Sequence, residues 1–157
     1  MEAARLATVD DLGDVAALLN EAYREVGDSK GGEMALRREL RPGPVTVDHI
    51  RPEVEDSDCL SLVGTIDDVN VGLALGRLET LRDGATICEI TEIFVLEDAR
   101  GVGVGEAMLD MAMDWARKRG CFRIESSVLP GNRAGKNFFE RAAMVTRMLR
   151  VSTSLDD

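Results

Sequence analysis

A glycine-rich turn between an apolar segment and a helical pattern is the part of this sequence best suited to chemistry. It runs Arg100-Gly101-Val102-Gly103-Val104-Gly105, after an apolar stretch at 87–96 and before a helix expected at 104–119. Glycines at alternate positions leave the backbone bare, so a ligand can approach the main chain closely. The first turn of a helix also presents unpaired amides at the positive end of its dipole. The pattern therefore predicts an anion-binding turn, most often a site for phosphate.

Three other interpretations of this turn compete with a phosphate site. The glycines could simply make a tight turn between a strand and a helix, and this interpretation stays open. A dinucleotide-binding G-x-G-x-x-G fingerprint needs its third glycine at the position of Glu106, so it fits poorly. A P-loop needs Gly-Lys-Ser or Gly-Lys-Thr, and the sequence contains neither.

The spacing R-x-x-G-x-G, with Ile93-Phe94-Val95 before it and Ala107-Met108-Leu109 after it, resembles the acyl-CoA-binding motif of the GNAT N-acetyltransferase superfamily. The resemblance implies acetyl-CoA as the acyl donor, with the loop amides holding the pyrophosphate. It also implies that the central strand parts from the next, so that amides near its end polarise the thioester carbonyl. The residues assigned to the cofactor in this way are Phe94, Val95, Arg100, Gly101, Val102, Gly103, Val104, Gly105 and Glu106.

A second segment, 132–140, resembles the family pattern N-x-x-A-x-x-F-Y-E. The resemblance implies that Asn132 bonds the pantetheine arm of the cofactor. It further implies that the last helix flanks the cofactor with Gly135, Lys136 and Phe138. The two motifs stand in the strand and helix order of the family, so together they are a strong signal.

The sequence departs from the family pattern at several positions near the C-terminus. Phe139 stands where the family often has a catalytic tyrosine, Gly135 where it has alanine, and Ala143-Met144 where it has Gly-Phe. Only about one strand, 144–155, follows the last helix, where many relatives have a hairpin. Edges of sheets are commonly covered by pairing, so we expect a homodimer that uses this edge.

The reaction implied by the resemblance is direct attack of a primary amine on the acetyl thioester. A lysine-like amine has a pKa of about 10.4, so deprotonating it at pH 7 costs about 4–5 kcal/mol and calls for a general base. Glu92 is the first candidate, because an acidic side chain midway along so apolar a strand usually has a function. Glu89 and Glu125 follow as the second and third candidates. Strand alternation puts Glu92 and Glu89 on opposite faces unless a bulge intervenes. Tyr23, the single tyrosine, is the candidate general acid.

The length predicts one domain, 1–157, and the family resemblance implies the α+β class in an α/β/α layering. The family resemblance implies a mixed, mostly antiparallel sheet of about six or seven strands flanked by about four helices. Hydrophobic alternation and helical spacing place these elements along the chain. We expect strands at 5–8, 60–66, 69–81, 86–96, 121–128 and 144–155, and helices at 12–23, 34–40, 104–119 and 133–142.

Composition limits the partners and the compartment. The formal net charge of −10 argues against nucleic acid, and no apolar run approaches the ~20 residues of a membrane span. Residues 1–5 do not resemble a signal peptide, so we expect a cytoplasmic protein. Three separated cysteines and one histidine indicate neither a disulfide framework nor a metal site. Residues 100–150 hold ten basic and five acidic residues, which suits the phosphates of coenzyme A.

The acceptor amine is less well defined by the sequence. Residues 41–58 are rich in proline and acid, with a possible short helix at 47–51, and are expected to form a mobile lid. Their acidic residues would border the acceptor and hint at a cationic small molecule or peptide: Asp48, Glu53, Glu55, Asp56 and Asp58. Two other functions stay open, a catalytically silent acyl-CoA sensor and an acyltransferase for longer acyl chains or non-amine acceptors.

Overall fold

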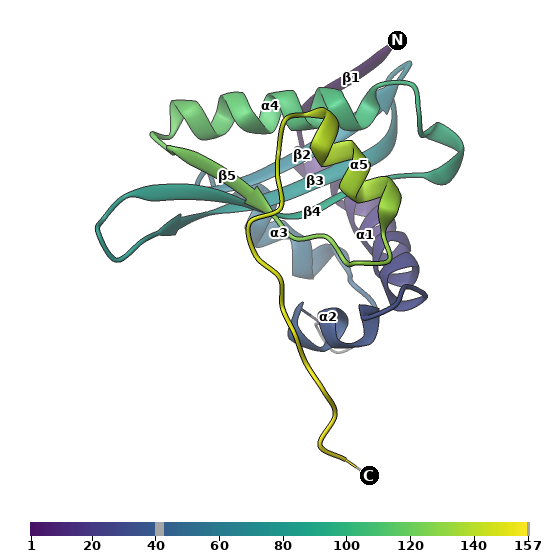
Figure 1. Cartoon of the computed structure of the whole chain (residues 1–157). Coiled ribbons are helices and arrows are strands. Elements are labelled where there is room, and N and C mark those ends of the chain that lie inside the picture. The colour runs from purple at the N-terminus through teal and green to yellow at the C-terminus, as the bar shows by residue number, and fades with distance from the viewer. Residues whose placement is uncertain (40–42, 157) are drawn as a thin grey trace.

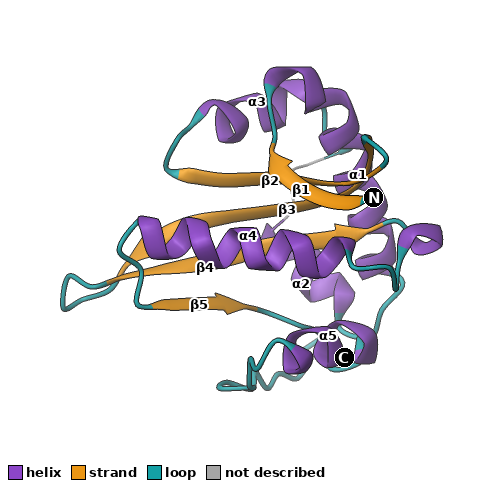
Figure 2. Cartoon of the chain, turned by 90° about the horizontal axis from the view of Figure 1, so that it is seen from above, coloured by secondary structure: helices purple, strands orange, loops and turns teal. Residues whose placement is uncertain are grey.

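A computed structural model describes residues 1–39 and 43–156 of the chain. A central sheet separates two helical layers, as Figures 1 and 2 show. The strands are β1 (Glu2–Leu6), β2 (Cys59–Ile66), β3 (Val69–Thr80), β4 (Thr86–Val95) and β5 (Arg123–Ser126). The helices are α1 (Leu12–Gly27), α2 (Gly32–Glu39), α3 (Val47–Glu55), α4 (Val104–Lys118) and α5 (Arg133–Arg141), with short 3-10 turns η1 (Val9–Asp11) and η2 (Glu97–Ala99).

The sheet has the strand order β1-β2-β3-β4-β5, so each strand pairs with its neighbour in sequence. The first three pairings are antiparallel, and those of β2 with β3 and of β3 with β4 follow from short turns, whereas β5 lies parallel to β4. The parallel pairing requires a crossover, which α4 provides. This arrangement confirms the predicted α+β class and its mixed, mostly antiparallel sheet.

Each face of the sheet is buried under a different set of helices. Helices α1 and α3 cover one face, where Leu12, Val15, Leu19 and Ile50 pack on Leu75 of β3. The apolar residues of α1 recur at the helical spacing that predicts such a stripe. Helices α4 and α5 serve the other face, whose buried residues include Leu60, Leu62, Ala74, Ile90, Val104, Met108, Leu109, Ala112 and Phe139. We call these the α1 face and the α4 face.

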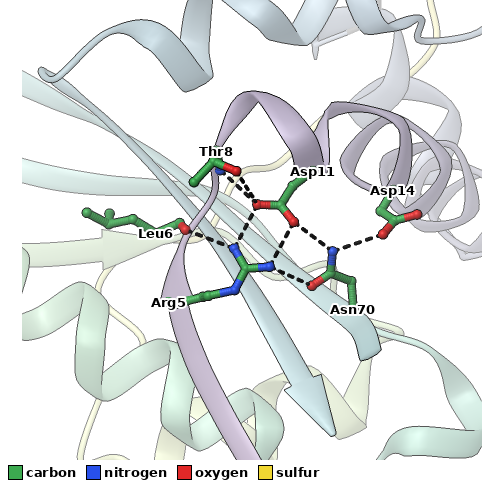
Figure 3. A network of polar contacts seen from close by, with 6 residues as sticks. All are labelled: Arg5, Leu6, Thr8, Asp11, Asp14 and Asn70. Atoms are coloured by element: carbon green, nitrogen blue, oxygen red, sulfur yellow. Dashed lines mark hydrogen bonds and ion pairs between the residues drawn. The ribbon is translucent and has the colours of Figure 1, made fainter. Parts of the chain in front are cut away.

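A polar network ties β1 to the start of α1 and to β3 (Figure 3). The Arg5 guanidinium donates to both oxygens of Asp11, at 2.7 and 2.8 Å. Asp11 also accepts from the Thr8 amide at 2.8 Å and from the Asn70 side chain at 2.9 Å. The Arg5 contact holds the pKa of the Asp11 carboxyl well below its usual range, although burial opposes that shift. The network fixes where α1 begins beneath the sheet.

The predicted terminal strand is the main error in the sequence interpretation. Residues 144–156 form no regular secondary structure, and the sheet has five strands rather than six or seven. In Figure 1 this yellow segment passes the end of β5 and extends away from the body of the molecule beyond α2. A strand needs a neighbour to pair its backbone, and this segment pairs with none of the described strands.

The expected mobile lid at 41–58 is also wrong for most of its length. Residues 47–55 form the helix α3, longer than the 47–51 predicted, with Ile50 completely buried and Val54 packed against the same core. Apolar anchoring therefore overrides the proline and acid content of this segment. The expected end of the preceding helix at Leu40, and Arg41 and Pro42 at the start of the expected lid, lie outside the described residues.

Strand boundaries differ from the expected ones where capping or turns intervene. The first strand covers Glu2–Leu6 rather than 5–8, because Thr8 already caps the turn η1. The strand expected at 121–128 shortens to Arg123–Ser126. Phe122 donates to the carbonyl of Thr86 at 3.2 Å, and no ladder continues beyond Ser126.

Candidate active site

Strands β4 and β5 run side by side only briefly and then part. Their pairing extends from Ile87 with Arg123 to Ile90 with Ser126, where the Ser126 hydroxyl also donates to the Ile90 carbonyl at 3.1 Å. Strand β4 continues to Val95, paired only with β3 among the described residues. The second half of β4 therefore has one edge without a strand partner, as the sequence analysis expected near Phe94 and Val95.

The glycine-rich turn follows β4 directly and leads into α4. Gly101 and Gly103 have φ angles of 82° and 103°, in the left-handed region that favours glycine. Gly103 is the N-cap of α4 and has no side chain to cap the helix. The first helical amide with a partner is that of Ala107, which donates to the Gly103 carbonyl at 3.0 Å. Within the described chain, the amides of 101–106 have no acceptor, so this helix start can bind an anion.

Gly105 has a packing role that the sequence analysis did not foresee. A Cβ at this position would lie 3.0 Å from Cε2 of Phe138, closer than side chains normally tolerate. Glycine therefore lets α5 approach the first turn of α4. Phe138 in turn lies edge-on to Phe139, with ring centroids 5.1 Å apart. The two motifs of the sequence analysis thus meet in space.

Arg100 holds the turn against α1. Its guanidinium donates to both carboxylate oxygens of Glu25, at 3.0 and 2.6 Å, and its Nε donates to the Val95 carbonyl at 2.8 Å. The guanidinium also lies 5.4 Å from the ring centre of Phe94. Hydrogen bonding to Glu25 is the main cause of its raised pKa. The Arg100 side chain therefore positions the loop, which leaves ligand binding to the backbone.

The N-terminus of α5 is arranged around Asn132. Its side-chain oxygen caps the helix by accepting from the Gly135 amide at 2.9 Å. A Cβ on residue 135 would lie 2.6 Å from Nδ2 of Asn132, so glycine replaces the alanine of the family pattern to make room for the cap. Lys136 is exposed and lies 3.7 Å from Glu140. Glu106, on α4, lies 3.9 Å from Arg141 of α5.

Phe139 is buried among apolar residues beneath α4. Its side chain is 8% exposed and belongs to the core cluster of the α4 face. The position where the family often has a catalytic tyrosine is therefore a packing position in this chain.

A bulge in β4 brings the glutamate candidates onto one face. Ile90 pairs with Gly76 and Glu92 pairs with Leu75, so Thr91 is an extra residue without a partner. Leu75 packs in the α1 core, which places Glu92 on the α1 face. Because the extra residue shifts the alternation, Glu89 faces the same way. The two carboxylates thus share one side of the sheet.

Glu89 and Glu125 line an acidic hollow on the α1 face, near the point where β4 and β5 part. The hollow has a volume of about 120 Å³ and is lined by Glu79, Ile87, Glu89, Glu125, Ser126 and Ser127. Two arginines offset part of its charge. Arg77 donates to Glu89 at 3.0 and 2.9 Å, and Arg123 lies 3.2 Å from Glu125. A cationic group suits this hollow better than an anion.

Tyr23 lies on α1, half-buried against the core of the α1 face. It therefore lies on the same face of the sheet as Glu92.

The loop between α1 and α2 meets the loop between β5 and α5. A Cβ on Gly31 would lie 3.7 Å from Leu129, and one on Gly131 would lie 3.6 Å from Lys30, so the α1–α2 loop touches the β5–α5 loop.

The acidic segment at 48–58 does not border this site, contrary to expectation. Helix α3 packs on α1, η1 and β2. Strand β2 lies near the edge of the sheet opposite β5. Asp58 pairs with Arg119, beyond the end of α4, at 2.7 Å. That ion pair holds the end of the acidic segment beside the C-terminus of α4. The glycine-rich turn lies at the N-terminus of α4, so the acidic segment does not cover it.

Across residues 1–39 and 43–156, no three histidine, cysteine or acidic side chains cluster as a metal site would require. No helix in the same residues is long and apolar enough to cross a membrane.

Comparison with known proteins identifies the fold and the family. A profile of the Acetyltransferase (GNAT) family matches residues 17–144, most of the chain. The chain belongs to the GNAT acetyltransferase family. The uncharacterized N-acetyltransferase of Methanocaldococcus jannaschii is 40% identical over 55 residues, which are 35% of this chain. The chain spans about a quarter, 24%, of the length of that curated relative.

Solved structures show how widely this GNAT fold is shared. The ribosomal-protein-alanine N-acetyltransferase of Brucella melitensis biovar Abortus 2308 superposes with a TM-score of 0.71 at 17% identity, covering 99% of this chain and 100% of its own. An aminoglycoside acetyltransferase from an uncultured soil metagenomic sample, in complex with sisomicin, gives 0.71 at 10% identity, covering 99% and 97%. At these identities the likeness shows the fold alone.

Proposed function

We propose that this protein transfers an acetyl group from acetyl-CoA to a primary amine. The observation that carries the proposal is the row of amides at 101–106, which have no acceptor within the described residues and lie beside the edge of β4 that β5 leaves. The bare turn suits a pyrophosphate because its amides converge at the positive end of α4. Family membership makes acetyl transfer the reaction to expect of such a site.

We assign the rest of the cofactor to the neighbouring elements. The amides near Phe94 and Val95 that face away from β3 lie where β4 has lost β5, and we assign to them the polarisation of the thioester carbonyl. Asn132 uses its side-chain oxygen as a cap, which leaves its Nδ2 group to bond the pantetheine arm. Helix α5 forms the neighbouring wall of the cofactor site. We assign to this wall the exposed Lys136, together with Gly135 and Phe138.

We assign proton transfer to side chains on the α1 face. Glu92 lies beyond the point where β4 and β5 part, so it is the base that takes the proton of the attacking amine. Tyr23 is the candidate acid for the departing thiolate. A thiol with a pKa near about 8.5 leaves readily, so the acid contributes less than the base.

We propose a cationic acceptor, a small molecule or a peptide, on the basis of the acidic hollow. The fold is shared by a ribosomal-protein-alanine N-acetyltransferase and by an aminoglycoside acetyltransferase. It is therefore compatible with a protein acceptor and with a small-molecule acceptor. The three free cysteines, Cys59, Cys88 and Cys121, suit the cytoplasm. We expect no role for nucleic acid or a membrane.

Thiol release from acetyl-CoA, measured with a panel of amines, tests the proposal. Glu92→Gln should lower kcat/KM by about 100-fold or more, because a general base typically supplies that much. The matched control is Glu89→Gln on the same face, whose carboxylate pairs with Arg77 and which we expect to change kcat/KM by less than about fivefold. A larger loss in the control would transfer the role of base to Glu89. Failure of polyamines, aminoglycosides and peptides, with success of neutral amines, would refute the cationic acceptor.

A silent acyl-CoA sensor is the alternative function, favoured by the burial of a hydroxyl-free Phe139. Binding of acetyl-CoA without thiol release from any amine would establish it. A series of longer acyl thioesters tests a different acyl chain.

A further inference from the structure

Lysine side chains are few in this chain, and one of them lies beside the candidate site. The sequence contains three, Lys30, Lys118 and Lys136. Lys30 is exposed in the loop between α1 and α2, and no ion pair with another described residue holds its ammonium group. In Figure 1 this loop lies beside the loop that leads from β5 into α5. An exposed amine at this place is a candidate for chemical modification.

The loop between β5 and α5 connects the two halves of the site. It runs from Ser127 to Asn132. Ser127, at one end, lines the acidic hollow that we assign to the acceptor. Asn132, at the other end, caps α5 and is assigned to the pantetheine arm of the cofactor. A side chain that packs on this loop therefore lies between the acceptor and the arm that carries the thioester.

Lys30 packs on this loop directly. A Cβ on Gly131 would lie 3.6 Å from the Cβ of Lys30 and 3.9 Å from its backbone nitrogen. Gly131 immediately precedes Asn132 in the chain. The Lys30 ammonium lies four single bonds beyond its Cβ, each about 1.5 Å long, and an exposed side chain changes rotamer rapidly. The amine therefore samples the region beside Asn132, where the thioester arm is assigned.

We propose that Lys30 accepts an acetyl group from the acetyl-CoA bound to its own chain. The proposal rests on the proposed function, because it needs a bound acetyl donor. The Lys30 nitrogen attacks the thioester carbonyl carbon, a C–N bond forms and the C–S bond breaks. The ammonium group loses two protons in all: one passes to solvent through the general base, and the other ends on the thiol of coenzyme A. Acetylation removes a positive charge near the acidic hollow, which then attracts a cationic acceptor more strongly.

The other lysines are less well placed for this reaction. Lys118 ends α4, at the opposite end of that helix from the glycine-rich turn. Lys136 lies on α5, but its ammonium is 3.7 Å from Glu140, one helical turn farther from Asn132. Transfer within one chain is favoured at Lys30, because an amine held beside a bound thioester has a high effective concentration.

Peptide mass spectrometry of the full chain, incubated with acetyl-CoA and no added amine, tests the proposal. We expect Lys30 to be acetylated about tenfold or more faster than Lys118, which reports the uncatalysed reaction in the same sample. The rate at Lys30 should not depend on protein concentration. Lys30→Arg keeps the charge and should abolish the fast reaction, whereas the matched control Lys118→Arg should leave it unchanged. Equal rates at Lys30 and Lys118, acetylation chiefly at Lys136, or a rate that rises with protein concentration would overturn the proposal.

Competition shows whether the acetyl group comes from the bound cofactor. Excess coenzyme A should slow acetylation of Lys30, because it occupies the donor site, and should leave the rate at Lys118 unchanged. An unchanged rate at Lys30 would overturn the proposal. Thiol release with the amine panel then separates the two hypotheses. An unmodified Lys30 together with thiol release to an added amine overturns only the acetylation of Lys30, whereas an unmodified Lys30 without thiol release to any amine overturns the proposed function as well.

Discussion

Asp11 shows how one buried carboxylate can make stability depend on pH. Its side chain is 6% exposed, and its pKa is held well below the usual range by hydrogen bonds, chiefly from Arg5. A carboxylate with a lowered native pKa stabilises the fold at pH values above its unfolded pKa of about 3.9. That stabilisation is lost as the pH falls below this value towards the native pKa.

We therefore predict that Asp11→Asn lowers the free energy of unfolding by about 2 kcal/mol at pH 7. The difference between the variant and the natural protein should shrink below about pH 4, where the Asp11 carboxyl of the unfolded chain begins to protonate while that of the folded protein stays ionised. Urea unfolding across a pH series measures both effects. Asp10→Asn, at an exposed neighbouring position, is the control and should cost less than about 0.5 kcal/mol. A gap that stays constant to pH 2 would contradict the prediction.

Phe139 allows a second prediction for a single residue. Phe139→Tyr restores the hydroxyl that the family often has, but at a side chain that is only 8% exposed. We expect no gain in kcat and a loss of about 1–3 kcal/mol of stability, because a buried hydroxyl needs a partner. Steady-state kinetics and thermal unfolding test this. A rise in kcat of tenfold or more would show that the position reaches the reacting atoms after all.

At the scale of elements, the start of α4 depends on glycine at the N-cap. Gly103 has a φ of 103°, and a side chain in the left-handed region costs about 1–2 kcal/mol. Gly103→Ala should lower stability by about that amount and weaken acetyl-CoA binding, since the amides of the turn would shift. Gly13→Ala on α1 is the control, because a Cβ there meets nothing within 4 Å. It should leave binding unchanged and raise stability by up to about 1 kcal/mol. Calorimetric titration and urea unfolding separate these effects, and equal binding by both variants would contradict the prediction.

Elements with strong periodicity could be predicted from the sequence, and those defined by long-range contacts could not. Helices α1, α4 and α5 and strands β2, β3 and β4 were expected from apolar spacing and turn residues. Helix α3 was predicted too short, at 47–51, because its extension to Glu55 depends on Val54 packing against the core, a contact that local pattern does not reveal. The strand expected at 144–155 has a strand-like sequence, but pairing depends on a neighbour, which local pattern does not reveal.

The candidate site could be predicted in outline, and its details depended on backbone irregularity. The two motifs located the glycine-rich turn and α5, whereas the bulge at Thr91 decided which way Glu89 faces. Gly76, opposite the bulge, was the available signal, because a glycine within a strand often marks such a feature. A Cβ on Gly76 would lie 3.0 Å from the Glu89 carbonyl. The residues assigned to the cofactor and to catalysis stay predictions.

For the whole molecule, the distribution of charge is only partly explained by the site. Six of the ten basic residues of 100–150 form two groups. Arg117, Lys118 and Arg119 end α4, far from the glycine-rich turn, where cations favour the helix dipole. Arg133, Lys136 and Arg141 lie on α5, which packs against the start of α4. Only the second group is placed to attract the phosphates of coenzyme A.

Binding of coenzyme A should therefore be visible in the thermal stability of the whole chain. A ligand at a hundredfold excess over its Kd adds about 2.7 kcal/mol to the free energy of unfolding. For a domain of this size, the melting temperature should rise by about 5–10 °C. Differential scanning at one fixed protein concentration measures the shift, because a dimer melts at a temperature that depends on concentration.

The specificity of that shift distinguishes the proposed site from a general anion site. Acetyl-CoA and coenzyme A should both raise the melting temperature, because the pyrophosphate is common to them. ATP and NADH also carry phosphates, yet they lack a pantetheine arm to lie between β4 and α5, so they should produce no shift. Gly103→Ala should reduce the shift given by acetyl-CoA, whereas Gly13→Ala should preserve it in full. An equal response to ATP would mean that the turn binds phosphate without selecting coenzyme A, and the acetyl donor would then have to be sought elsewhere.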